Sequence, residues 1–409
     1  MAKRKVKDKR KKGLAKVSPM RLTLLLHLLF VIFYVLVVGT RYSGILRMME
    51  ANSWTDDYIL HLFRWPLVGA LVYAVPMALV GLLFCLFRLR RYAPWTILAP
   101  LSLAYFCAPH ANSHEGGARL FSAEMNQEEQ VCSYVLLADE KKWDELLQTL
   151  GKDGNLNTPL GMRYALLAES ALGRLPQKLF TYPIRSAEEL LFRGDRSPLM
   201  CQFNRQFYEN LGVYDEAFHQ AMEYGTHQQD GCCLASLRQL TDYALEQGDW
   251  QVAEKYLAIL DEAWLQGGFV EQRRARLLGV KEQTQKAEAE NDSLAMVPLR
   301  GESFVGLYPL RSELVRLAYY HEGDDQKTVD YLLCVILLEK NLQTFYSVLT
   351  QFPNYQGRAL PQAYQEALDI LQSEGLALRD APVGTYANFF YNVSIEDPSQ
   401  DLVMHSINE

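Results

Sequence analysis

The chain has 409 residues, of which 49% are hydrophobic, and a formal net charge of −7, so its length and composition allow a sizeable core. The charge is unevenly distributed: residues 1–20 carry +8 and residues 21–108 carry +4, which leaves −19 for residues 109–409. An acidic surface repels phosphate backbones, so we do not expect the large C-terminal part to bind nucleic acid.

The first predicted element is a membrane anchor that follows a basic cytoplasmic tail, residues 1–20. Eighteen residues from Leu22 to Gly39 carry no formal charge. At about 1.5 Å per residue, this run can cross a hydrocarbon core of about 30 Å as a helix. A signal peptide is the competing interpretation, but no convincing cleavage site follows and further apolar runs come later, so we expect a retained anchor. His27 inside the run either marks a helix contact or packs near one end of the span.

Two further apolar runs complete a predicted transmembrane region, residues 21–108. Residues 65–87 form a strong span of 23 uncharged residues, in which Ala70, Ala74 and Ala78 make a small face on which another helix can pack. Residues 93–108 form a shorter run with two prolines, so the predicted spans lie at about 22–39, 65–87 and 93–108.

The positions of the cations predict the orientation. Lys and Arg are concentrated in the N-terminal tail and in Arg88, Arg90 and Arg91, and cytoplasmic flanks favour such residues. With three crossings, the chain is a multi-pass protein of the cell inner membrane and its C-terminal domain lies in the periplasm. If the third run does not cross, that domain lies in the cytoplasm instead.

Residues 109–395 form a predicted acidic, all-α domain with helical periodicity. An aromatic group around Phe389 is expected to dock on the last helices, and residues 396–409 are predicted to be a flexible tail. The other expected helices lie at 125–138, 142–150, 158–172, 272–290, 312–320, 328–339, 342–350 and 360–373, with a short capped helix near 186.

Two segments of this domain repeat one pattern at a spacing of 36 residues. A glycine, an aromatic residue and a small alanine recur, and each set opens a run with helical spacing. The glycine permits a tight turn, the aromatic residue wedges the hairpin and the alanine lets two helices approach. This pattern indicates a solenoid of stacked helix hairpins. The two sets are Gly212, Tyr214 and Ala217, and Gly248, Trp250 and Ala253.

These residues resemble the tetratricopeptide repeat, whose helix pairs have a similar length and turn pattern. Arg205 and Thr241 depart from that family, which usually has a small glycine at those positions, and no proline closes either repeat. The segment 360–368, together with the basic N-terminus and the apolar runs, resembles a family of uncharacterised Bacteroidota inner-membrane proteins. That resemblance implies architecture and location, but no mechanism.

Candidate chemistry is sparse. His110, His114 and Glu115 could ligate a metal if they were helical, but the surrounding Asn, Ser and Gly residues favour a loop. The acidic turn His321, Glu322, Asp324 and Asp325 has the composition of a cation site, although such turns are usually solvated. The seven cysteines lack zinc-type spacing and are expected to be small buried residues, although Cys232 or Cys233 could pair elsewhere in an oxidising compartment.

The sequence therefore predicts an interaction protein rather than an enzyme. We expect a membrane-anchored helical-repeat scaffold at the cell envelope that binds a protein or peptide partner. No catalytic motif or phosphate-binding loop is present, so no catalytic residue, metal ligand or cofactor is assigned, and the partner-binding residues are unknown. The alternative is an accessory subunit of a membrane transport or envelope-glycan assembly, in which the alanine face packs on partner helices.

Overall fold

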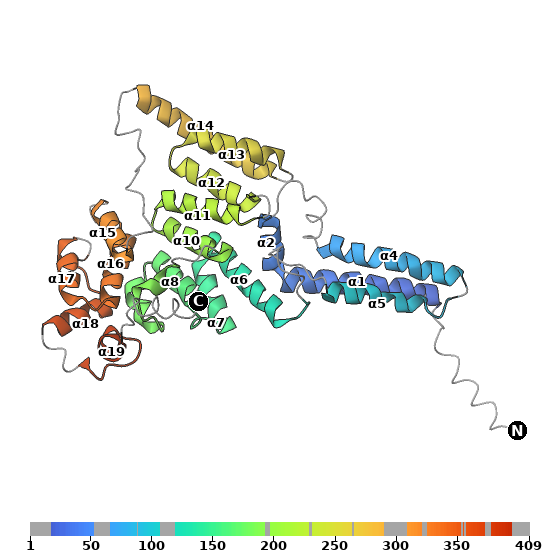
Figure 1. Ribbon diagram of the computed structural model, residues 1–409, viewed down its shortest axis with the longest axis horizontal. Coiled ribbons are helices and arrows are strands. Elements are labelled where there is room, and N and C mark those ends of the chain that lie inside the picture. The colour runs from blue at the N-terminus through green and yellow to red at the C-terminus, as the bar shows by residue number, and fades with distance from the viewer. Residues whose placement is uncertain are drawn as a thin grey trace, which may run out of the picture. The chain divides into compact units, whose positions relative to one another are not determined.

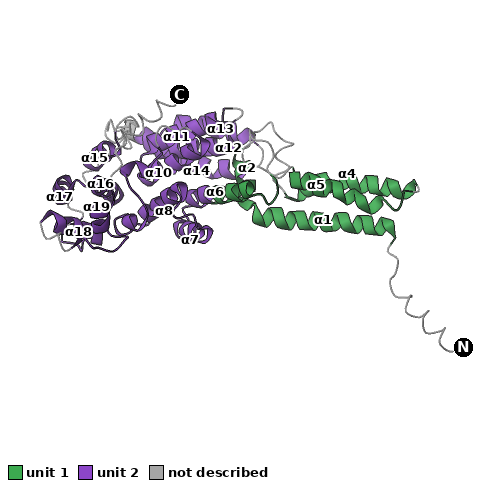
Figure 2. Ribbon diagram, turned by 60° about the horizontal axis from the view of Figure 1, so that its bottom comes forward, with its two compact units in different colours: residues 1–133 green, residues 134–409 purple. Residues whose placement is uncertain are grey.

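The computed structural model contains helices and no strand in the part of the chain that it describes, so the prediction of an all-α protein is confirmed there (Figure 1). Two compact units divide the chain, residues 1–133 and residues 134–409 (Figure 2). The described residues are 18–52, 66–87, 89–106, 119–192, 197–228, 231–263, 266–289, 309–320, 325–352, 355, 357–372 and 378–394.

The first unit contains the apolar helices. Ser18 caps the first of them, because its side-chain oxygen accepts a hydrogen bond from the Arg21 backbone N–H at 3.3 Å. The elements of this unit are α1 (Pro19–Arg41), α2 (Ser43–Asn52), α4 (Pro66–Leu86), the 3₁₀ helix η2 (Ala93–Ile97), α5 (Leu98–Phe106) and the start of α6 (Ala123–Asp139).

Helices α1 and α4 are long and apolar enough to cross a membrane, which agrees with the predicted spans 22–39 and 65–87. The third predicted span, 93–108, corresponds to the shorter apolar helix Ala93–Phe106, which is 3₁₀-helical in its first part. Large side chains such as Leu36 and Leu79 point outward, each more than half exposed. This outward distribution of leucine suggests membrane association.

The predicted small face of the second span is used inside this unit. Ala70 and Ala74 are buried, and Gly69 lies so close to α1 that a Cβ there would be 3.5 Å from the Tyr34 ring. Helices α1 and α4 pack on each other along this face. This chain's own first helix therefore covers the alanine face at Ala70 and Ala74, whereas Ala78 is only partly buried.

His27 lies on the buried side of α1, together with Thr23 and Tyr34. Its Nδ1 is 2.8 Å from the Thr23 carbonyl oxygen, one turn earlier, and its Nε2 is buried without a hydrogen-bond partner among the described residues. Because α1 packs on α4 and η2, His27 belongs to the packed interior of this helix group and does not face outward.

The second unit is a succession of short helices that pack largely on their neighbours in the chain: α10 on α11, α11 on α12, α12 on α13 and α13 on α14. The elements after α6 are α7 (Trp143–Asp153), α8 (Pro159–Ala171), α9 (Leu175–Lys178), η3 (Leu179–Thr181), η4 (Ala187–Leu190), α10 (Pro198–Asn210), α11 (Tyr214–Thr226), α12 (Leu234–Glu246), α13 (Trp250–Glu262), α14 (Gly267–Ala289), α15 (Leu310–Tyr320), α16 (Gln326–Leu338), α17 (Leu342–Gln351), α18 (Gln362–Leu371) and α19 (Tyr386–Asn392).

Five turns of this unit share one backbone geometry. At each, a residue with positive φ is followed by a residue whose N–H donates to the carbonyl five positions earlier, and the next helix begins two positions after the positive-φ residue. Such a turn satisfies carbonyls that a helix end leaves unpaired. Gly212 and Gly248, with φ of 70° and 76°, are the two turns that the sequence pattern identifies. The positive-φ residues are Lys141, Gly173, Gly212, Gly248 and Lys340.

Ala217 and Ala253, the predicted small contact residues, are both fully buried. The C-terminal aromatic group docks as predicted: α19 packs on α18, and the Phe180 ring lies 5.0 Å from the Tyr386 ring, centroid to centroid. The capped helix expected near 186 is the single 3₁₀ turn η4, and its Ser186 side chain makes no capping hydrogen bond. The likeness to the tetratricopeptide repeat stays a prediction.

Candidate functional site

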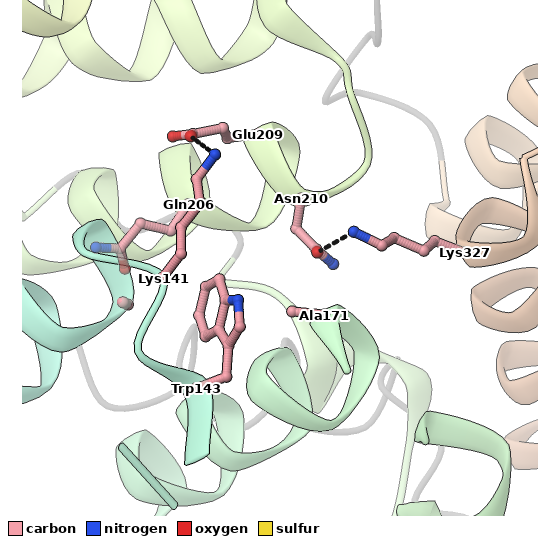
Figure 3. A pocket seen from close by; sticks show the side chains of 8 residues that line it. Lys141, Trp143, Ala171, Gln206, Glu209, Asn210 and Lys327 are labelled. Carbon is pink, nitrogen blue, oxygen red and sulfur yellow. Dashed lines mark hydrogen bonds and ion pairs between the residues drawn. The ribbon is translucent and has the colours of Figure 1, made fainter. Parts of the chain in front are cut away.

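The second unit contains a polar pocket of about 90 Å³ where the α6–α7 turn, the end of α8, the last turn of α10 and the start of α16 meet (Figure 3). Its charged lining consists of two lysines and one glutamate. The lining residues are Ala138, Lys141, Trp143, Ala171, Gln206, Glu209, Asn210 and Lys327.

The α6–α7 turn supplies one wall of this pocket. Lys141 adopts φ of 56°, and the Lys142 N–H donates to the Leu137 carbonyl oxygen at 2.9 Å. This tight turn makes Trp143 the first residue of α7 and keeps its indole at the pocket, only partly buried. Trp143 therefore lines a surface cavity, whereas Leu146 on the same helix is fully buried.

The last turn of α10 supplies the opposite wall. The Lys141 ammonium lies 3.2 Å from Glu209 Oε1, and the Lys327 ammonium donates to Asn210 Oδ1 at 3.2 Å (Figure 3). The Asn210 amide nitrogen in turn donates to the Ser170 hydroxyl at 3.0 Å. Lys327 comes from the first turn of α16, so the pocket combines side chains that are far apart in the sequence.

Behind the pocket wall formed by α10 lies a buried guanidinium, that of Arg205, whose side chain is 3% exposed. Its NH1 donates to the Tyr243 hydroxyl at 2.9 Å and to Glu209 Oε2 at 3.1 Å, and its NH2 donates to Asp139. Its Nε donates to Gln202 at 2.9 Å, so the guanidinium has partners on α6, α10 and α12.

The electrostatics of this cluster favour full ionisation. Burial by itself would lower the pKa of Arg205, but Asp139, the Tyr243 hydroxyl and Glu209 raise it well above its ordinary value. Burial would likewise raise the pKa of Glu209, yet the guanidinium of Arg205 and the Tyr243 hydroxyl bring it below its ordinary value. Glu209 is therefore a carboxylate at neutral pH.

Gln206 joins the guanidinium cluster to the pocket. Its Nε2 donates to the Val135 carbonyl at 2.9 Å and to Asp139 Oδ1 at 2.7 Å. Its Oε1 is buried and has no hydrogen-bond partner in the described part of the chain.

The pocket lining carries two ammoniums and one carboxylate, a local net charge of +1 within a chain of net charge −7.

These pocket residues were not predicted from the sequence. Arg205 was noted there only as a departure from the tetratricopeptide pattern, and nothing in the spacing of Lys141 or Lys327 marks them as neighbours. A positive φ at a lysine leaves no signal in the sequence, because glycine is the residue type that marks such a conformation. The one usable signal was the partly polar start of α7, where a tryptophan follows two lysines.

The metal candidates from the sequence do not contribute to this site. His110, His114 and Glu115 lie outside the described residues, as do His321, Glu322 and Asp324. Asp325 is described, and it caps α16: its two carboxylate oxygens accept from the Lys327 and Thr328 backbone N–H groups at 3.1 and 3.3 Å. No cluster of three or more potential metal ligands occurs among the described residues. Cys132, Cys201, Cys233 and Cys334 are buried, as expected, whereas Cys85 and Cys232 are only partly buried.

The fold defines an all-α protein with two N-terminal helices long and apolar enough to span a membrane. Residues 7–385 match the model of a family described as a family of unknown function, DUF6057, and the chain belongs to that family. A search of curated proteins and a search of solved structures each found no match. Family membership covers the apolar helices and most of the second unit, and it assigns no activity.

Proposed function

We propose that the protein is a membrane-anchored helical-repeat scaffold, not an enzyme, that binds a protein or peptide partner at the cell envelope. The observation that carries this proposal is the pocket: two lysines stand beside a partly exposed indole in a domain whose sequence is otherwise acidic. An ammonium pair attracts a carboxylate, and an indole offers apolar contact, so the pocket suits an acidic side chain or a chain terminus next to an apolar residue.

The recurring turn geometry supports the repeat part of the proposal. Positive-φ residues at 141, 173, 212 and 248 are separated by 32, 39 and 36 residues, close to the period of helix-hairpin repeats. Stacked hairpins bury their apolar faces on their neighbours and leave extended surfaces for binding. In this proposal, Gly212 and Gly248 are two members of a longer series of repeat turns, which also includes the turns at Lys141 and Gly173.

The contacts of the third apolar helix support three membrane crossings. Leu120 N–H donates to the Tyr105 carbonyl oxygen at 2.9 Å, and Phe121 N–H donates to the Tyr42 hydroxyl at 3.1 Å. The end of α5 is thereby linked to the end of α1, whereas η2 lies by the opposite end of α1, near Thr23. A chain that leaves α5 on the side where α1 ends, with the basic tail inside, carries its C-terminal domain into the periplasm.

Site-specific photo-crosslinking in cells tests the binding proposal. A benzoylphenylalanine at position 143 should capture a discrete partner, and adding Lys327→Gln should reduce capture several-fold, because the pocket loses one of its two ammoniums. The control places the same probe at Ile259, which is 41% exposed on α13 and outside the pocket. Equal capture from both positions, or capture that is unaffected by Lys327→Gln, would contradict the proposal.

The accessory-subunit alternative requires the apolar helices for capture. The alanine face on which it depends is covered at Ala70 and Ala74 and only partly exposed at Ala78, so little of it is free for a partner helix in the described part of α4. Affinity purification in detergent of the full-length chain and of a fragment from about residue 118 separates the two. Capture by the fragment supports the scaffold, and capture only by the full-length chain supports the accessory subunit.

A further inference from the structure

The first unit contains an apolar cleft of about 110 Å³ between α1 and α5. Almost all of the accessible lining is apolar, and the lining includes Phe30, Tyr34, Val38, Leu101, Ala104 and Phe121. At its edge, Phe33 and Leu101 are 50% and 44% exposed. The cleft is therefore open along the same outward side on which the leucines of α1 are exposed.

The cleft spans most of the depth of one leaflet of a bilayer. Its lining follows α1 from Phe30 to Val38, less than one turn before the helix ends at Arg41. Eight residue steps of helix rise about 12 Å, and half of a hydrocarbon core of about 30 Å is about 15 Å. A chain in this cleft would run from the headgroup level to about the middle of the membrane.

Two arginines stand at the end of the cleft where α1 terminates. The Arg41 guanidinium lies 5.5 Å from the centre of the Phe121 ring, which lines the cleft, and donates to the neutral Asn126 side chain at 3.3 Å. The Arg119 guanidinium lies 6.0 Å from the Phe106 ring. Both arginines are exposed, and neither forms an ion pair with a carboxylate among the described residues. Two cations at the mouth of an apolar cleft complement an anionic headgroup joined to a hydrocarbon chain.

We propose that this cleft binds one acyl chain of an anionic phospholipid, whose phosphate lies beside Arg41 and Arg119. The inference rests on the membrane placement of α1 and α4 proposed above. Tyr105, which is 43% exposed at this end, lies where membrane proteins place the tyrosines that favour the interface between hydrocarbon and water. A neutral lipid would fill the same cleft but leave both guanidiniums without an anion.

Native mass spectrometry of the full-length chain, released from nanodiscs with equal amounts of phosphatidylglycerol and phosphatidylcholine of identical acyl chains, tests the inference. The wild-type chain should retain one lipid with about a tenfold preference for phosphatidylglycerol, because two exposed arginines each favour the anion. The double variant Arg41→Gln/Arg119→Gln should retain lipid with a preference near one. Leu101→Trp, which places a large ring at the cleft edge, should lose the retained lipid.

Matched controls separate this cleft from general lipid contact. Arg91→Gln removes a guanidinium that also stacks on an aromatic ring, 4.7 Å from Tyr92, but lies before η2 in the chain. Leu79→Trp adds the same ring to an exposed position of α4. Both should behave as the wild type.

No preference in the wild-type chain, or an equal loss of preference in Arg91→Gln, would overturn the inference. Release of the chain from membranes by alkaline carbonate would overturn the inference and the membrane placement together. Membrane retention with no lipid preference would overturn the lipid site alone.

Discussion

The two units place leucine differently. In the first unit, the leucines at 36 and 79 are more than half exposed, and the buried residues of α1 and α4 include Thr23, Ala70 and Ala74 beside the aromatic Phe30 and Tyr34. In the second unit, leucine and aromatic side chains fill the interior, and the charged residues lie mostly outside. Helices in lipid gain little from hiding leucine from their surroundings, whereas helices in water gain most of their stability from it. The contrast agrees with the proposed placement of α1 and α4 in a membrane.

Arg205 is a buried charged residue in the second unit, where most charged residues lie at the surface. Its replacement should give the largest loss of stability among the variants considered. Arg205→Ala leaves the carboxylates of Asp139 and Glu209 without their buried cation, so the free energy of unfolding of the second unit should fall by about 3–5 kcal/mol. Hydrogen-exchange mass spectrometry over α10 and α12 measures this change. The matched control is Arg274→Ala, which breaks an exposed pair with Asp261 and should cost no more than about 1 kcal/mol. Similar effects for the two variants would show that the buried cluster contributes nothing special.

Asp330 makes the stability of the second unit depend on pH. Burial raises the pKa of this carboxyl from 3.8 to about 6, although Tyr355 and Gln326 donate hydrogen bonds to it. Between about pH 4 and pH 6, Asp330 is therefore protonated in the folded chain and ionised in the unfolded chain. The free energy of unfolding falls as the pH rises through this window, and the loss of this contribution is complete above about pH 6.

Replacement of Asp330 by Asn should remove this part of the pH dependence, which is on the order of 1–3 kcal/mol. Unfolding temperatures of both forms between pH 4.5 and 7.5 measure it. The wild-type chain should lose stability relative to Asp330→Asn as the pH rises, and a constant difference across this range would contradict the prediction. Hydrogen exchange over α1 and α4 in the same samples should not respond to the substitution.

The stability of the first unit should depend on close helix packing, whereas the stability of the second should depend on the burial of large side chains. A Cβ at Gly81 would lie 2.7 Å from Thr23 Cγ2 and 3.2 Å from the Ala93 carbonyl oxygen, so both neighbours must move. Gly81→Ala should destabilise the packing of α4 on α1 and η2 by about 1–3 kcal/mol. The control Leu79→Ala removes an outward side chain and should have little effect in a lipid nanodisc. A larger effect of the leucine variant, measured by hydrogen exchange of α1, would argue that water and not lipid surrounds this unit.

Substitution of a turn glycine should give the smallest change in stability. The sign of the change distinguishes a glycine that needs a positive φ from one inside a helix. Gly248 adopts φ of 76°, so Gly248→Ala should destabilise the second unit by about 1 kcal/mol. Gly279 lies inside α14 with open space around its Cβ position, so Gly279→Ala should stabilise that helix by about 0.5–1 kcal/mol. Thermal unfolding of the two variants should therefore shift in opposite directions, and shifts of the same sign would contradict this explanation of the repeated glycine.

Local sequence patterns were sufficient for the elements that local physics controls. The uncharged runs predicted α1 and α4, because a helix that crosses hydrocarbon needs about 20 apolar residues in succession. Helical spacing predicted α6, α8 and α16 to within a few residues at each end, and the repeated glycines marked two turns that need a positive φ. All of these signals lie within one helix or one turn of the chain.

Only the tertiary structure revealed the pocket and its support. Arg205 meets Asp139 across 66 positions, and Lys327 meets Asn210 across 117 positions, so no local pattern relates the members of either pair. Lys141 and Lys340 form the same turn as Gly212 without a glycine, because the hydrogen bonds of the turn can offset the unfavourable conformation of one residue. Periodicity in the chain decides which residues are helical. The partners of a buried charge are decided by how those helices pack, since the energy of a guanidinium away from water depends on every group around it.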